Sequence, residues 1–99
     1  MKALLVTTDN EVKLLDEEFH YERINELVGG WIEAVNFGDN SFFAYVNEEG
    51  KIIGLPENKL ATEFWYNSGQ RILLGDYLAG NALFFGEVDD EGNNTDVIS

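Results

Sequence analysis

The first third of the chain changes from a strand pattern to a helix pattern. Residues 2–8 are rich in leucine and β-branched side chains, and after a polar turn residues 11–16 alternate charged with apolar side chains, which predicts a β-hairpin. Over residues 20–28 apolar side chains recur at helical spacing, which predicts a short amphipathic helix. We expect Gly29-Gly30 to end this helix.

Aromatic and aliphatic runs dominate the rest of the chain. Residues 31–37 and 41–47 predict a second hairpin, joined by the three-residue loop 38–40. A helix of one or two turns is expected at residues 57–64, just after a proline. Residues 80–88 predict the last strand.

These elements predict an α+β domain, with a small antiparallel or mixed sheet of about five strands and one or two helices packed on it. A chain of 99 residues fits one domain. We expect residues 1–92 to form this single acidic domain and residues 93–99 to form a short polar C-terminal tail.

The charge balance makes this domain strongly acidic. Nineteen Asp and Glu against six Lys and Arg give a net charge of −13. Direct nucleic-acid binding is not expected, because it needs clustered cations. The charge also has an explanation without function, since it keeps a protein soluble. No apolar run approaches the roughly 20 residues of a membrane-spanning helix, and the first residues lack the pattern of a signal peptide. We therefore expect a soluble protein that does not bind membranes.

Residues for catalysis, metal binding or cofactor binding are not recognisable. The absence of cysteine excludes thiol nucleophiles and thiolate zinc sites. His20 is the only histidine, it has no nucleophilic partner, and we expect it to face solvent at the start of the first helix. The oxygen-rich residues 89–96 fail the EF-hand spacing, and no phosphate-binding glycine motif occurs. We expect no enzyme activity, no metal and no cofactor.

A family resemblance rests on three blocks: VGGWIEAV (28–35), VNEEGKIIGLPENKLAT (46–62) and ILLGDYLAGNALFFGEVDDEG (72–92). With these blocks in this order, the chain resembles a small domain family of unknown function that recurs in bacteriophages and other mobile elements. The resemblance brings no reaction, cofactor or catalytic residue. It implies a protein of the bacterial cytoplasm that modulates host enzymes or defence systems. Turns and caps alone also explain the glycines and the proline of these blocks.

The first functional hypothesis combines this context with the charge. A non-enzymatic accessory protein would bind a host or defence protein through an acidic surface, as DNA-mimicking inhibitors bind basic nucleic-acid-binding grooves. The candidate contacts are acidic residues from three places in the sequence. They are Glu17, Glu18, Glu22, Glu26, Glu48, Glu49, Asp89, Asp90 and Glu91.

The second hypothesis starts from the triplet Phe64-Trp65-Tyr66. At least one of three consecutive rings must point away from the core, in a helix or in a strand. Trp65, Tyr66 and Arg71 are therefore candidates to bind a metabolite or a nucleotide-derived signal between protomers, by stacking and charge.

The aromatic run around Phe42, Phe43 and Tyr45 poses a related question, because it places rings on both faces of one strand. We expect a helix to cover one face and a dimer partner to cover the other. A binding site for a partner or ligand is the alternative.

Overall fold

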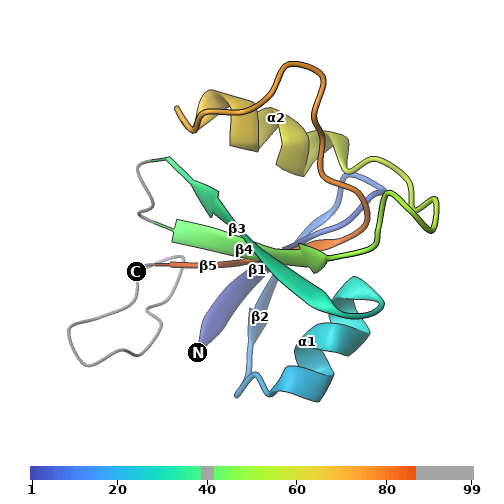
Figure 1. Cartoon of the computed structure of the whole chain (residues 1–99). Helices are drawn as coiled ribbons and strands as arrows, with labels where there is room; N and C mark the ends of the chain where they lie inside the picture. Colours follow the sequence, from blue (N-terminus) through green and yellow to red (C-terminus); the bar gives the residue numbers. More distant parts are fainter. Residues whose placement is uncertain (39–41, 87–99) are drawn as a thin grey trace.

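The computed structural model describes residues 1–38 and 42–86, and these residues form an α+β fold. The predicted fold class is confirmed: a five-stranded antiparallel sheet is combined with two helices (Figure 1). The elements are β1 (Lys2–Val6), β2 (Val12–Asp16), α1 (Tyr21–Val28), β3 (Ile32–Phe37), β4 (Phe42–Asn47), α2 (Lys59–Asn67) and β5 (Ala82–Phe85).

The last strand forms the centre of the sheet. The strand order is β2-β1-β5-β4-β3, so β5 lies between the two predicted hairpins, both of which are confirmed. Leu83 of β5 lies opposite Leu5 of β1 on one side and opposite Tyr45 of β4 on the other. All four residues of β5 are buried, because strands flank it on both sides and a helix covers each face.

The two helices cover opposite faces of the sheet (Figure 1). Under α2, Phe37, Ala44 and Phe84 pack with Ala61 of the helix. Under α1, the cluster contains Ala3, Leu5, Ile24, Leu83 and Phe85. Successive residues of β5 therefore serve different cores, as the alternation of a strand requires.

The helix expected over one face of the strand that carries Phe42, Phe43 and Tyr45 is present, and the opposite face also carries a helix, while a dimer partner stays a prediction (Figure 1). Phe42 packs against the core under α2, whereas Phe43 and Tyr45 pack against the core under α1. Because each face carries its own helix, the aromatic side chains on both sides of β4 are covered within one chain.

The helix ends follow from single residues. Gly29 adopts a left-handed conformation with φ 84° and caps α1, as predicted. The second helix begins two residues later than predicted and ends at Asn67 instead of residue 64. Its start is set by Asn58, whose side-chain oxygen accepts a hydrogen bond from the Ala61 N–H at 3.0 Å. Glu57 is not helical, because it forms an isolated bridge with Ala79.

Three asparagines join the layers, and all three lie in the sequence blocks that carry the family resemblance. Asn47 donates to the Val28 carbonyl, Asn58 to the Val6 carbonyl and Asn81 to the Leu27 carbonyl. Asn47 also accepts a hydrogen bond from the Glu49 N–H, and Asn81 accepts one from the Thr8 N–H. Asn58 also donates to the Gly80 carbonyl. These block residues therefore hold the fold together.

The last strand is shorter than predicted. Residues 87–88 and the predicted tail 93–99 lie outside the described residues.

In the part of the chain that the structure describes, neither helix has the length and apolar character to cross a membrane.

Candidate protein-interaction surfaces

The predicted acidic contacts gather around α1 where the structure describes them. Glu17 and Glu18 lie in the loop before the helix, and Glu22 and Glu26 lie on it. Of these four, Glu17 is partly buried and the other three are exposed. The remaining candidates Asp89, Asp90 and Glu91 lie outside the described residues.

The turn that carries Glu48 and Glu49 lies beside the C-terminal end of α1. The Asn47 side chain donates to the Val28 carbonyl at 3.4 Å, and the Glu48 N–H donates to the Trp31 carbonyl at 2.8 Å. Both glutamates of this turn are exposed. The fold therefore places two sets of acidic residues, which are distant in the sequence, at the two ends of α1.

Arg23 is the one basic residue between Lys13 and Lys51, and acidic neighbours engage its guanidinium. Arg23 Nε donates to Glu17 Oε1 at 2.7 Å, and Arg23 Nη1 lies 3.9 Å from Glu26 Oε1. The hydrogen bond to Glu17 is the main cause that raises the pKa of Arg23. The α1 region thus keeps an excess of negative charge, and its cation is already paired.

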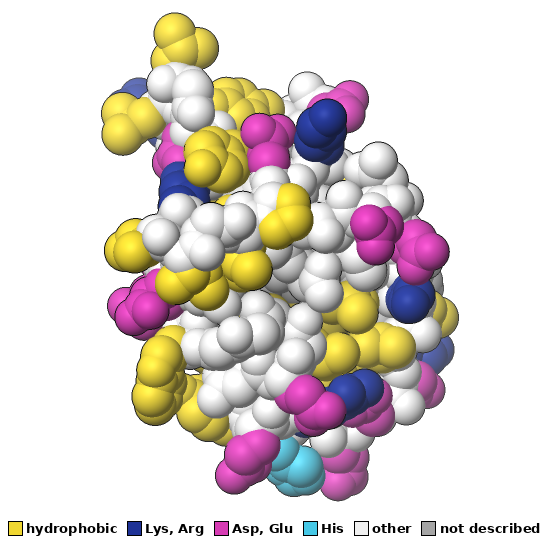
Figure 2. All heavy atoms as spheres, turned by 90° about the vertical axis from the view of Figure 1, so that its right-hand side faces the viewer, with side chains coloured by type: hydrophobic (Ala, Val, Ile, Leu, Met, Phe, Trp, Pro, Cys, Tyr) yellow, Lys and Arg dark blue, Asp and Glu magenta, His cyan; other side chains and the backbone are white. Residues whose placement is uncertain are grey.

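Charge is divided unequally along the described chain. Residues 50–86 carry three acidic and three basic side chains, whereas the other described residues carry ten acidic and three basic ones. The neutral segment supplies α2 and the loops on either side of it, and the acidic segment supplies α1. In Figure 2, acidic side chains surround the lower part of the molecule near the one histidine.

His20 lies directly before α1. This residue stands at the N-cap position of α1, it is exposed, and its side chain does not cap the helix. Within residues 1–38 and 42–86, no three His, Asp or Glu side chains are grouped closely enough to hold a metal ion.

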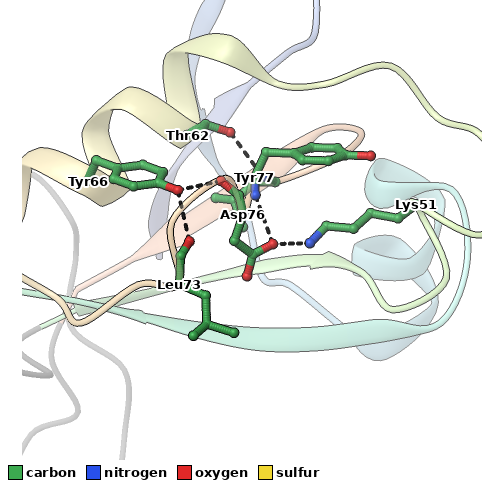
Figure 3. Close-up of polar contacts among 7 residues, drawn as sticks. Lys51, Thr62, Tyr66, Leu73, Asp76 and Tyr77 are labelled. Atoms are coloured by element: carbon green, nitrogen blue, oxygen red, sulfur yellow. Dashed lines mark hydrogen bonds and ion pairs between the residues drawn. The ribbon is translucent and has the colours of Figure 1, made fainter.

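Trp65 and Tyr66, two of the candidate ligand-binding residues, form hydrogen bonds within the fold through their polar side-chain atoms. Trp65 Nε1 donates to the Asn36 carbonyl at 3.2 Å. The Tyr66 hydroxyl lies 2.7 Å from the Asp76 carbonyl and 3.1 Å from the Leu73 carbonyl (Figure 3). Arg71 is exposed in the loop that follows α2. The two aromatic residues therefore anchor the neighbouring chain segments.

An ion pair stabilises the same loop. Lys51 pairs with Asp76, whose carboxylate also accepts a hydrogen bond from the Tyr77 N–H (Figure 3). The hydrogen bond from Lys51 holds the pKa of Asp76 below its ordinary value of 3.8, although partial burial of the carboxyl group opposes this shift. Next to this anchored turn, Leu73 and Leu74 are 81% and 100% exposed.

A second exposed apolar feature lies at the acidic end of the molecule. Tyr21, Ile24, Val28 and Trp31 follow one another at helical spacing in the sequence, but Tyr21 and Trp31 are 49% and 63% exposed. Ile24 and Val28 are buried. The ring centroids of Tyr21 and Trp31 lie 6.4 Å apart, with an angle of 50° between the ring planes.

Comparison with known proteins adds a family assignment. Residues 1–99 match the family described as Domain of unknown function (DUF3846). Neither the curated proteins nor the solved structures gave a match.

Proposed function

The chain belongs to this family of unknown function, and from its surface we propose that it is a non-enzymatic binding protein whose acidic α1 side docks onto a basic partner. The partner class is a host or defence protein of a bacterial cell. The proposal includes an origin in a phage or mobile element and an action in the cytoplasm, both of which rest on the sequence resemblance.

The observation that carries the proposal is the placement of acidic residues at both ends of α1. Glu17, Glu18 and Glu22 lie at its start, and Glu48 and Glu49 lie beside its end. Like charges held together in one region raise the free energy of the isolated protein. A basic partner relieves this repulsion, so the arrangement favours association with a cationic surface.

A basic nucleic-acid-binding groove is the proposed docking surface. Such a groove is built to hold closely spaced phosphates, and an array of carboxylates presents the same sign of charge. Electrostatic attraction would accelerate association and would make it sensitive to salt, because exposed charges are screened beyond about 8 Å at physiological ionic strength.

Small-ligand binding through Trp65, Tyr66 and Arg71 has less support. The indole N–H and the phenol hydroxyl, which would orient a ligand, already bind backbone carbonyls. We therefore place the functional surface on the α1 side.

The test compares two variants that lose the same number of charges. One variant carries Glu22→Gln, Glu26→Gln, Glu48→Gln and Glu49→Gln. The control carries Asp9→Asn, Glu11→Gln, Glu57→Gln and Glu63→Gln, four exposed acids that belong neither to α1 nor to the Glu48–Glu49 turn. Wild-type protein and control should capture the same bacterial protein at low salt, and the α1 variant should lose it.

The captured protein is then purified, and its affinity is measured between about 50 and 200 mM salt, where charge screening changes strongly. We expect the affinity to fall with salt and double-stranded DNA to displace the acidic protein. Equal capture by the α1 variant would show that the acidic side is not the docking surface.

A further inference from the structure

Tyr21 and Trp31 form an exposed aromatic pair built from two different elements. Tyr21 is the first residue of α1, and Trp31 directly precedes β3. Their rings meet at a centroid distance of 6.4 Å, while about half of Tyr21 and more of Trp31 stay open to solvent. Neither ring belongs to the two buried clusters of the described residues. Large aromatic side chains exposed together are typical of binding hot spots.

An acidic residue neighbours each member of this pair. Glu22 follows Tyr21 in the helix, and the Glu48 N–H donates to the Trp31 carbonyl at 2.8 Å, which places the Glu48–Glu49 turn next to the tryptophan. On the face shown in Figure 2, hydrophobic side chains lie between acidic ones in the lower part of the molecule. The faces of aromatic rings carry negative electrostatic potential, so the rings and the carboxylates here both attract cations.

The chemistry of such a pair selects among cations. A guanidinium group is planar, stacks on aromatic faces and gives paired hydrogen bonds to a carboxylate, whereas an ammonium group is a compact and strongly hydrated charge. A second copy of this chain is disfavoured as occupant, because it would bring the acidic residues around α1 of both copies together. A nucleobase would stack well, but its phosphate would be repelled.

We propose that Tyr21 and Trp31 bind an arginine side chain of the basic partner, with the neighbouring glutamates holding the guanidinium group. This inference rests on the proposed function and adds to it a specific anchor. The acidic residues then provide attraction to any cation, and the aromatic pair provides preference for arginine over lysine.

The experiment uses two defined probes of equal charge, a hexa-arginine and a hexa-lysine peptide, and measures their affinities by calorimetry on the full chain. Wild-type protein should bind the arginine peptide about three-fold more tightly, the size expected for an exposed cation–π contact. The double variant Tyr21→Leu, Trp31→Leu should lose the part of this preference that stacking on the rings provides, and should keep the part that comes from paired hydrogen bonds to the glutamates. Both positions are largely exposed, so the fold should persist, which circular dichroism checks.

Two controls separate this inference from the proposed function. Phe64→Leu changes a half-exposed ring on α2 and should leave the arginine preference intact. The four-residue glutamine variant of the α1 side should bind both peptides more weakly while a preference for arginine remains. Equal affinities in the wild type, or a preference of undiminished size in the double variant, would overturn the aromatic anchor and leave the acidic docking surface standing. Failure of the wild type to bind either peptide would overturn both.

Discussion

The side chain of Asn58 reaches the end of β1, where its Nδ2 donates to the Val6 carbonyl at 2.9 Å. The same amide nitrogen donates to the Gly80 carbonyl at 3.0 Å, and the amide oxygen caps α2 at Ala61. Asn58 is fully buried. One side chain thereby fixes the start of α2 against the sheet and against the loop that leads into β5.

Asn58→Ala should lower the free energy of unfolding by about 3 kcal/mol, because it leaves two buried carbonyls and one helix N–H without their partner. Urea unfolding followed by circular dichroism measures the change. Asn67→Ala, at the exposed end of α2, is the matched control and should stay within about 0.5 kcal/mol of the wild type. A loss of similar size in both variants would contradict the role assigned to Asn58.

Gly80→Ala should destabilise the fold more than Gly54→Ala. Both glycines have left-handed backbones, with φ of 80° and 78°, so both variants carry the same backbone strain. A Cβ on Gly80 would also lie 2.8 Å from Leu55 Cδ1, whereas a Cβ on Gly54 would meet nothing within 4 Å. We expect about 1 kcal/mol for the strain and a further 1–2 kcal/mol for the contact at Gly80. Equal thermal shifts would show that Leu55 moves aside freely.

The ion pair between Lys51 and Asp76 should give a pH-dependent contribution to stability. Because the pKa of Asp76 is lower in the folded state than its ordinary value of 3.8, the pair stabilises the fold above that pH. The contribution is lost as the pH falls through the folded-state pKa. Asp76→Asn should therefore be less stable than the wild type by about 0.5 kcal/mol at pH 7, because the pair is partly exposed.

The difference between wild type and Asp76→Asn should shrink as the pH falls through the lowered folded-state pKa of Asp76, because the aspartate then becomes protonated in both states. Glu63→Gln, which removes an exposed acid from α2, corrects for the general effect of one charge. A difference that persists unchanged in strong acid would show that Asp76 acts through packing instead of charge.

Asn25→Ala should make the protein more stable. The Asn25 Oδ1 atom is buried and accepts no hydrogen bond from the described residues, which is unfavourable in the folded state. Alanine removes this acceptor and has a higher helix propensity, so we expect a gain of about 1 kcal/mol. Differential scanning calorimetry provides the measurement. A lower melting temperature would indicate that the Asn25 side chain contributes packing that outweighs its unpaired oxygen.

The two hairpins were predictable because their signals are local. A polar turn between short apolar runs fixes the pairing of β1 with β2, and the same holds for β3 with β4. The central place of β5 was not predictable, because its partners Leu5 and Tyr45 are distant in the sequence. The start of α2 was missed because a proline commonly precedes or begins a helix, which favoured a start at residue 57, although Asn58 is also a common N-cap residue.

The candidate surface was predictable in part. Charge alone identified the six glutamates that the structure describes around α1, but their common location depends on the contact between Asn47 and Val28, which no local pattern contains. The exposure of Tyr21 and Trp31 was missed because helical spacing assigns residues to one face without saying how wide the buried part is. Ile24 and Val28 fill the contact with the sheet, and the aromatic pair lies beside it.

The grouping of six glutamates around α1, with the neutral segment that supplies α2 over the opposite face of the sheet (Figure 1), gives the described part of the molecule an electric dipole. In the field of a positively charged surface, such a dipole rotates the molecule before contact, so that the α1 layer arrives first and fewer collisions are lost to wrong orientations. The α2 layer then faces away from that surface with Leu73 and Leu74 uncovered. A complex formed in this way would keep this apolar loop exposed to the surrounding solution, and the partner would thereby acquire an apolar surface that it lacks alone.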